Sequence, residues 1–109
     1  MSSLLHIEII PFHHEQTASI AAEAYSRVSE KLGVAVVTSG PGSTNAITGV
    51  ASAWIDSIPL MIISGQVFSK QTIGDSNLRQ LGVQESDVVT LSKPITKYSK
   101  MLTNKNDIK

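Results

Sequence analysis

The sequence predicts an α/β domain, a three-layer αβα arrangement of helices around a mostly parallel sheet. Two short apolar runs, residues 34–37 and 59–64, lack the polar alternation of a half-exposed strand, as strands buried on both faces do. Segments with the helical spacing of apolar residues precede and separate these runs. The resulting order of strand, helix, strand, helix and strand requires parallel pairing through right-handed crossovers.

The chain begins with a β-prone segment. Residues 4–10 are rich in leucine and isoleucine, and Pro11 closes the predicted strand. A helix is predicted next, because apolar and small residues recur on one face at positions 18, 21, 22, 25, 28 and 32. Gly33 is the predicted end of this helix, since glycine is common just past a helix C-terminus.

The second unit is a strand, a tight turn and a helix. The strand at 34–37 runs into a turn at 39–42, where two glycines flank Pro41. Side-chain oxygens at 43–45 suit the start of a helix. This helix carries a large apolar stripe, formed by Ile47, Val50, Ala51 and Trp54. A second face consists of the small residues Ala46, Gly49 and Ala53. The small face favours close packing against a sheet or a second subunit, and a strand at 59–64 follows.

The last third of the chain is less regular. Residues 68–84 are polar and contain several turn signals, which predicts a surface loop. A short helix is predicted over 85–91. Residues 95–102 alternate in part after Pro94, which favours an edge strand.

Composition excludes several classes of protein. The 109 residues make one domain at most, and nine basic residues balance nine acidic ones. The chain therefore has no basic field for nucleic acid or a membrane surface, and we expect neither as a partner. It has no cysteine for disulfides or thiolate metal sites, which fits a cytoplasmic location. The longest apolar run is too short to span a bilayer.

Candidate site residues follow three predicted strands. Glu15, the turn from Gly40 to Asn45, and Gln66 all lie where a strand ends, so they share one rim of a parallel sheet, where α/β proteins bind ligands. The turn matches neither G-x-x-x-x-G-K-[ST] nor G-x-G-x-x-G, and Ala18 breaks a H-E-x-x-H zinc motif, so we predict no metal ligand. From the residues alone, a helix N-terminal carboxylate stabilised by the helix dipole is the favoured interpretation of Glu15, and a helix cap is the alternative for Asn45.

A set of motifs in fixed order adds a family resemblance. The chain resembles the pyrimidine-binding domain of thiamine diphosphate enzymes, closest to the acetolactate synthase group, from about residue 7 to residue 101. No single motif is specific, but the set is. It comprises His14-Glu15-Gln16, residues 21–27, Thr38 to Asn45, residues 56–60, Ser64 to Val67, Ile73-Gly74, residues 84–89 and residues 94–97.

The resemblance implies roles for five residues. Glu15 matches the glutamate that hydrogen-bonds N1′ of the cofactor's pyrimidine and so assists removal of the thiazolium C2 proton. Such a proton transfer favours a desolvated carboxyl group with a raised pKa. Pro41 and Asn45 match positions lining the pyrimidine, with Gly40 in the same turn. Gln84 matches a position near cofactor and substrate.

The resemblance also implies a larger enzyme. Residues 1–109 match a partial pyrimidine-binding domain without its first strand–helix unit, and the diphosphate-binding domain with its Mg²⁺ motif is not in this sequence. The implied function is a carboligase or decarboxylase for a 2-oxo acid such as pyruvate, in branched-chain amino acid biosynthesis. The implied full enzyme is a homodimer or homotetramer in which a second subunit binds the diphosphate, and FAD is compatible with it. We expect the isolated chain to be inactive. A non-catalytic split-subunit or partner-binding module is the alternative, and an unrelated nucleotide-binding domain is a third hypothesis.

Overall fold

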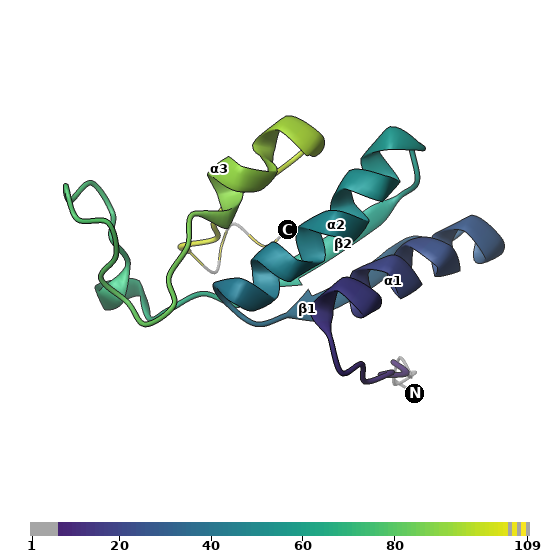
Figure 1. Cartoon of the computed structure of the whole chain (residues 1–109), viewed down its shortest axis with the longest axis horizontal. Helices are drawn as coiled ribbons and strands as arrows, with labels where there is room; N and C mark the ends of the chain where they lie inside the picture. The colour runs from purple at the N-terminus through teal and green to yellow at the C-terminus, as the bar shows by residue number, and fades with distance from the viewer. Residues whose placement is uncertain (1–6, 105, 107, 109) are drawn as a thin grey trace.

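The computed structural model describes residues 7–104, 106 and 108. Two long helices pack beside a two-stranded parallel sheet (Figure 1). These elements are α1 (Glu15–Ser29), β1 (Gly33–Val37), α2 (Pro41–Ile55) and β2 (Leu60–Ser64). In the sheet register, Gly33 lies beside Leu60 and Val37 beside Ser64. The predicted α/β class and its parallel pairing are confirmed.

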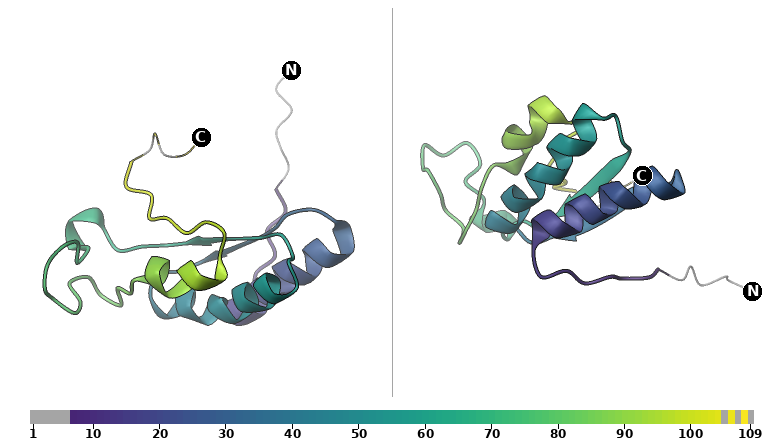
Figure 2. Two further views of the ribbon diagram at one scale, coloured as in Figure 1. Left: turned by 90° about the horizontal axis from the view of Figure 1, so that it is seen from above. Right: turned by 45° about the vertical axis from the view of Figure 1, so that its right-hand side comes forward.

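Both long helices cover the same face of the sheet (Figure 2). In β1 the alternate residues Gly33, Ala35 and Val37 are buried, whereas Val34 and Val36 are exposed. The expectation that these strands are buried on both faces is therefore wrong for the described residues. A second helical layer, which would complete the three-layer arrangement, is not present among residues 7–104.

The core consists of small side chains. Its buried apolar residues are Ala22, Ala35, Val37, Ala46 and Ala53. The helices approach closely where Gly49 of α2 meets Ser19 of α1, because a Cβ on Gly49 would lie 2.4 Å from Ser19 Oγ. The small face of α2 thus packs inward, as its composition predicts, and its large apolar stripe does not.

Helix α1 ends before the predicted position. Glu30 forms its C-cap with a left-handed φ of 58°, three residues before Gly33. Gly33 belongs to β1, and it must be glycine because a Cβ there would lie 2.0 Å from the carbonyl oxygen of Ala22. Ser26 ties the helix to both strands. Its hydroxyl accepts from Gly33 N–H at 2.7 Å and donates to the Pro59 carbonyl at 2.5 Å.

Residues 68–104 contain three short helical elements. They are the 3₁₀ turn η1 (Ser69–Gln71), helix α3 (Val88–Ser92), capped by Asp87, and the 3₁₀ turn η2 (Lys93–Ile95). The predicted loop at 68–84 and short helix at 85–91 are confirmed with small shifts in their bounds. The predicted edge strand at 95–102 is wrong, because this segment begins in η2 and pairs with no strand of the described chain.

The N-terminal segment also differs from its prediction. Residues 1–6 lie outside the described part of the chain, and residues 7–10 are not in a strand. Ile7, Ile9 and Ile10 are exposed. The β propensity of this segment finds no partner strand among the described residues, and Pro11 prevents its extension toward α1.

Candidate functional site

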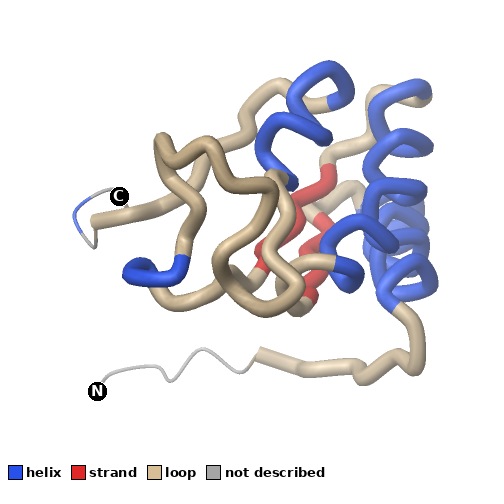
Figure 3. Tube along the Cα trace, turned by 60° about the vertical axis from the view of Figure 1, so that its left-hand side comes forward, coloured by secondary structure: helices blue, strands red, loops and turns tan. Residues whose placement is uncertain are grey.

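The candidate site lies at the end of the sheet where both strands terminate. Three residues separate the end of β1 from the start of α2, and α1 begins beside α2, so two helix N-termini meet at this rim (Figure 1). Figure 3 is turned to bring this end forward, with the loop between β2 and α3 in front of the strands. Positive ends of two helix dipoles therefore face the same region, which favours an anionic or carboxylate group there.

Glu15 and Asn45 are paired directly at this rim. Glu15 is the first residue of α1 and Asn45 lies in the first turn of α2. Asn45 Nδ2 donates a hydrogen bond of 3.1 Å to Glu15 Oε2, and both residues are half-buried. The structure thus brings together two predicted site residues that are thirty positions apart. Asn45 is not the cap of α2, because that position belongs to Gly40.

The pKa of Glu15 is lowered from its ordinary value. The hydrogen bond from Asn45 is the largest cause, and a backbone N–H and the nearby His14 act in the same direction. Partial burial acts in the opposite direction and is outweighed. A raised pKa was expected for a catalytic acid here. The described chain does not produce one, because the hydrogen bonds to the half-buried Glu15 carboxylate outweigh the effect of its burial on the pKa.

At Gly40 the turn packs closely against the loop that carries Gln84. Its φ of 60° and ψ of −121° match the first central position of a type II′ turn, which strongly favours glycine. A Cβ on Gly40 would lie 1.9 Å from the carbonyl oxygen of Gln84. Gln84 itself has a left-handed φ of 56°. The backbone of Gln84 therefore packs against the turn, as its predicted place near the site requires.

The turn packs closely against the Glu15 carboxylate and Thr38. A Cβ on Gly42 would lie 3.1 Å from Glu15 Oε1 and 2.5 Å from Thr38 Cγ2. Pro41 is the first residue of α2 and is exposed, a position where its missing N–H costs nothing. Within the turn, Gly42 is thus the residue that lies directly beside Glu15. Thr38 was not among the predicted site residues, and its place directly before the turn is the signal that could have identified it.

Glu85 holds the loop before it together. Its carboxylate accepts from the backbone N–H groups of Ile73 at 2.7 Å, Gly82 at 3.1 Å and Leu81 at 3.3 Å. These bonds, the one from Ile73 first, lower the pKa of Glu85. The sequence reasoning missed this role, although a carboxylate directly after a glycine-containing loop is a usual acceptor for free backbone N–H groups.

Two other predicted residues lie at the rim without joining the pair. His14 caps α1, with Nδ1 accepting from the Gln16 N–H at 3.2 Å. Gln66 is exposed, and its Oε1 accepts from the N–H of Val67 at 2.9 Å. Its neighbour Gly65 is closer to the turn, because Gly65 N–H donates to the Val37 carbonyl at 2.8 Å.

The described residues contain no group of three or more His, Cys, Asp or Glu side chains that could hold a metal ion. Within the same residues, no helix has the length and apolar character needed to cross a membrane. The arrangement that remains is a carboxylate, an amide and a glycine turn at the carboxyl ends of parallel strands. It defines the chain as an α/β domain of the ligand-binding class.

Comparison with known proteins identifies the family. Residues 1–91 match the family described as "Thiamine pyrophosphate enzyme, N-terminal TPP binding domain". The chain therefore belongs to the thiamine pyrophosphate (thiamine diphosphate) enzymes, and the resemblance inferred from the motifs is confirmed.

Three relatives bear the name of acetolactate synthase. The large subunit from Buchnera aphidicola subsp. Acyrthosiphon pisum is 48% identical over 102 residues, which are 94% of this chain and 17% of that protein. The large subunit from Lactococcus lactis is 45% identical over the same shares of both proteins. The isozyme 3 large subunit from Escherichia coli is 42% identical, again over 94% of this chain and 17% of the relative. The chain thus spans about a sixth of the length of these relatives.

Proposed function

We propose that the chain forms the pyrimidine-binding part of an acetolactate synthase-like enzyme that acts on a 2-oxo acid such as pyruvate. The observation that carries this proposal is the Glu15–Asn45 pair beside the Gly40–Gly42 turn. The donor set suits an aminopyrimidine, because such a ring presents nitrogen acceptors and an amino donor, and a carboxyl and an amide can serve both.

In this proposal Glu15 acts on N1′ of the bound pyrimidine. Asn45 engages Oε2 as a donor, so the proton that Glu15 shares with the ring sits on Oε1, the oxygen that faces Gly42. Pro41 and Gly40 form the wall beside the ring, and Gln84 approaches from the loop. Thiamine diphosphate, when bound, would supply a nucleophilic carbon for attack on the 2-oxo acid.

Glu15 needs a drier environment than this chain provides. Its lowered pKa keeps the carboxylate ionised at neutral pH, whereas a shared proton requires a higher pKa. Further protein surface over the rim would exclude water and raise that pKa. We therefore propose that the isolated chain is inactive and that a second subunit, with Mg²⁺ and the diphosphate, completes the site in a dimer or tetramer. The same proposal makes the full enzyme a transferase or lyase of branched-chain amino acid biosynthesis. It also includes FAD in the full enzyme and a cytoplasmic location.

A chimera tests this function. Residues 7–102 replace the matching segment of the Lactococcus lactis large subunit, and acetolactate formation from pyruvate and exchange of the thiazolium C2 proton are measured. Glu15→Gln should reduce both by a factor of about 100 or more, as expected for loss of a general acid. Glu30→Gln, the same change at the exposed other end of α1, should leave both unchanged. Unchanged exchange in Glu15→Gln would refute the role of Glu15. An inactive parent chimera that folds and assembles would favour the non-catalytic partner-binding alternative.

A further inference from the structure

Gln84 has a backbone conformation that its residue type rarely adopts. Its φ of 56° lies in the left-handed region, where a side chain crowds the backbone and glycine is the usual residue. Glu30 and Ser57 share this conformation, but each lies just past the C-terminal end of a long helix, where left-handed residues are common. Gln84 lies in a loop instead. A strained residue of this kind persists only where its surroundings hold it, and such residues cluster at functional sites.

The strain at Gln84 belongs to a tight turn. Glu85 N–H donates to the Gly82 carbonyl at 3.3 Å, which places Val83 and Gln84 at the two central positions of a β-turn. Because φ is positive at Gln84 and not at Val83, the turn has the φ pattern of type II, whose second central position normally requires glycine or asparagine. Glycine would fit there without strain, so a glutamine at this position indicates that its side chain is used.

Glu85 closes this turn with its side chain as well as its backbone. Its Oε2 accepts from the N–H groups of Gly82 at 3.1 Å and Leu81 at 3.3 Å. Its Oε1 accepts from the N–H of Ile73, twelve positions earlier, at 2.7 Å. One carboxylate therefore ties the start and the end of the loop to the turn that contains Gln84. Loss of the carboxylate would leave three N–H groups without this acceptor and would release the turn.

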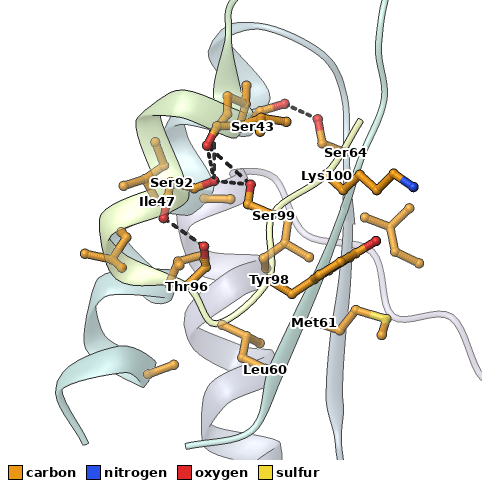
Figure 4. A pocket seen from close by; sticks show the side chains of 18 of the residues that line it. Ser43, Ile47, Leu60, Met61, Ser64, Ser92, Thr96, Tyr98, Ser99 and Lys100 are labelled. Carbon is orange, nitrogen blue, oxygen red and sulfur yellow. Dashed lines mark hydrogen bonds between the residues drawn. The ribbon is translucent and has the colours of Figure 1, made fainter. Parts of the chain in front are cut away.

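Both ends of the loop between β2 and α3 are fixed independently of Glu85. Ser64, the last residue of β2, is hydrogen-bonded to Ser43 of α2, and Ser92, the last residue of α3, is hydrogen-bonded to Ser99 (Figure 4). Loss of the Glu85 carboxylate should therefore change the conformation of the loop without releasing β2 or α3.

The turn also contacts the candidate site. The backbone of Gln84 lies directly against Gly40, the residue that caps α2, since a Cβ on Gly40 would lie 1.9 Å from the Gln84 carbonyl oxygen. On its other side the turn packs on Val67, because a Cβ on Gly82 would lie 2.7 Å from Val67 Cγ1. Gln84 itself is exposed. An exposed side chain on a backbone that is fixed from several sides is pre-organised for contact with a ligand.

We propose that Glu85 is a positioning residue, which holds Gln84 in its strained conformation and so makes the Gln84 carboxamide available to the substrate. The amide N–H₂ group is a hydrogen-bond donor, and the oxygens of an ionised 2-oxo acid are acceptors. The inference rests on the proposed function, because it takes the substrate at this rim to be a 2-oxo acid.

NMR relaxation of the complete ¹⁵N-labelled chain tests the positioning itself. The order parameter of the Gln84 N–H should be that of a rigid backbone, about 0.85, and should fall below about 0.6 in Glu85→Ala. Glu85→Gln keeps the size of the side chain and one acceptor oxygen, so it should give an intermediate value. Asp75→Asn removes an exposed acid from the same loop and should leave the value unchanged. An unchanged Gln84 in folded Glu85→Ala and Glu85→Gln would overturn the proposal.

The chimera tests the consequence for the substrate. Glu85→Ala should raise the KM for pyruvate about tenfold or more, as expected for the loss of hydrogen bonds to a charged group. Exchange of the thiazolium C2 proton depends on Glu15 and should stay close to that of the parent chimera. Asp75→Asn should change neither quantity.

A double-mutant cycle separates positioning from general support of the loop. Gln84→Gly removes the carboxamide and relieves the strain, so it should raise KM without lowering Tm. Glu85→Gln should then have little further effect on KM in the Gln84→Gly background, because positioning matters only while the positioned side chain is present.

Two results in an active chimera would overturn the proposal. The first is an equal effect of Glu85→Gln on KM with and without Gln84, because the carboxylate would then support the loop alone. The second is a parallel loss of C2 proton exchange in Glu85→Gln, because the effect would then reach Glu15 as well. A folded and assembled parent chimera without activity would refute the proposed function instead, and the order parameter of Gln84 would still decide whether Glu85 positions it.

Discussion

Replacing Gly40 by alanine should destabilise the chain far more than the same change at Gly74. Both glycines have positive φ, 60° and 50°, so alanine is strained at either position by about 1–2 kcal/mol. They differ in their surroundings. A Cβ on Gly40 would lie 1.9 Å from the Gln84 carbonyl oxygen, whereas a Cβ on Gly74 would meet no atom within 4 Å. Backbone overlap of this kind adds about 1–3 kcal/mol.

Gly40→Ala should therefore lower the free energy of unfolding by about 2–5 kcal/mol and Gly74→Ala by about 1–2 kcal/mol. Since about 1 kcal/mol shifts Tm by 4–8 °C in a domain of this size, the two variants should melt several degrees apart. Urea denaturation followed by Trp54 fluorescence, together with thermal melting by circular dichroism, measures both. Equal losses in the two variants would refute the close approach of the turn to Gln84.

Two further predictions concern charged groups. Asn45→Leu should raise the pKa of Glu15, because the Asn45 hydrogen bond is the main cause that lowers it. Carboxyl ¹³C NMR titration measures this pKa. The control Thr44→Val, one position earlier in α2, should leave the pKa of Glu15 unchanged. A carboxyl group whose pKa is lowered in the folded state stabilises the protein at pH values above its ordinary pKa, and this stabilisation is lost as the pH falls through the pKa of the folded state. Asn45→Leu should therefore make the free energy of unfolding less dependent on pH in the acid range. An unchanged acid unfolding transition would contradict this. Arg27 pairs with buried Glu23 at 2.5 Å and with half-exposed Asp56. Arg27→Met should lower the free energy of unfolding in urea more than Asp56→Asn does, because it leaves the buried Glu23 carboxylate with the Ser52 hydroxyl as its remaining side-chain donor. The reverse order would contradict the assignment.

The sequence allowed the central unit of the fold to be predicted because its signals are local. The apolar runs at 34–37 and 59–64, the glycine turn between strand and helix, and the helical spacing after Gln16 each act within a few residues. The β1–α2–β2 crossover follows from them, and the structure has it. The strands expected at 4–10 and 95–102 depend instead on a partner strand. A β-prone segment without a partner remains irregular, as residues 7–10 and 96–102 do.

The candidate site was predictable in its place but not in its electrostatics. The rule that ligands bind at the carboxyl ends of parallel strands correctly predicted that Glu15 and the Gly40–Asn45 turn share one rim. Whether a carboxylate at that rim is raised or lowered in pKa depends on its burial and on which donor reaches it. Asn45 Nδ2 reaches Glu15 at 3.1 Å, and that distance is not contained in the sequence spacing of the two residues.

The orientation of α2 links the unfinished fold to the unfinished site. Periodicity predicts that Ile47, Val50 and Trp54 share a face, and hydrophobicity alone would turn that face inward. The helix instead buries Gly49 against Ser19, because the absence of a Cβ lets two backbones come closer than large side chains would allow. The apolar stripe is then only partly covered within the described chain, with Trp54 45% exposed, and Glu15 at the rim is only half-buried. Covering either surface would exclude water from this α/β unit, and only a surface over the rim would raise the pKa of Glu15.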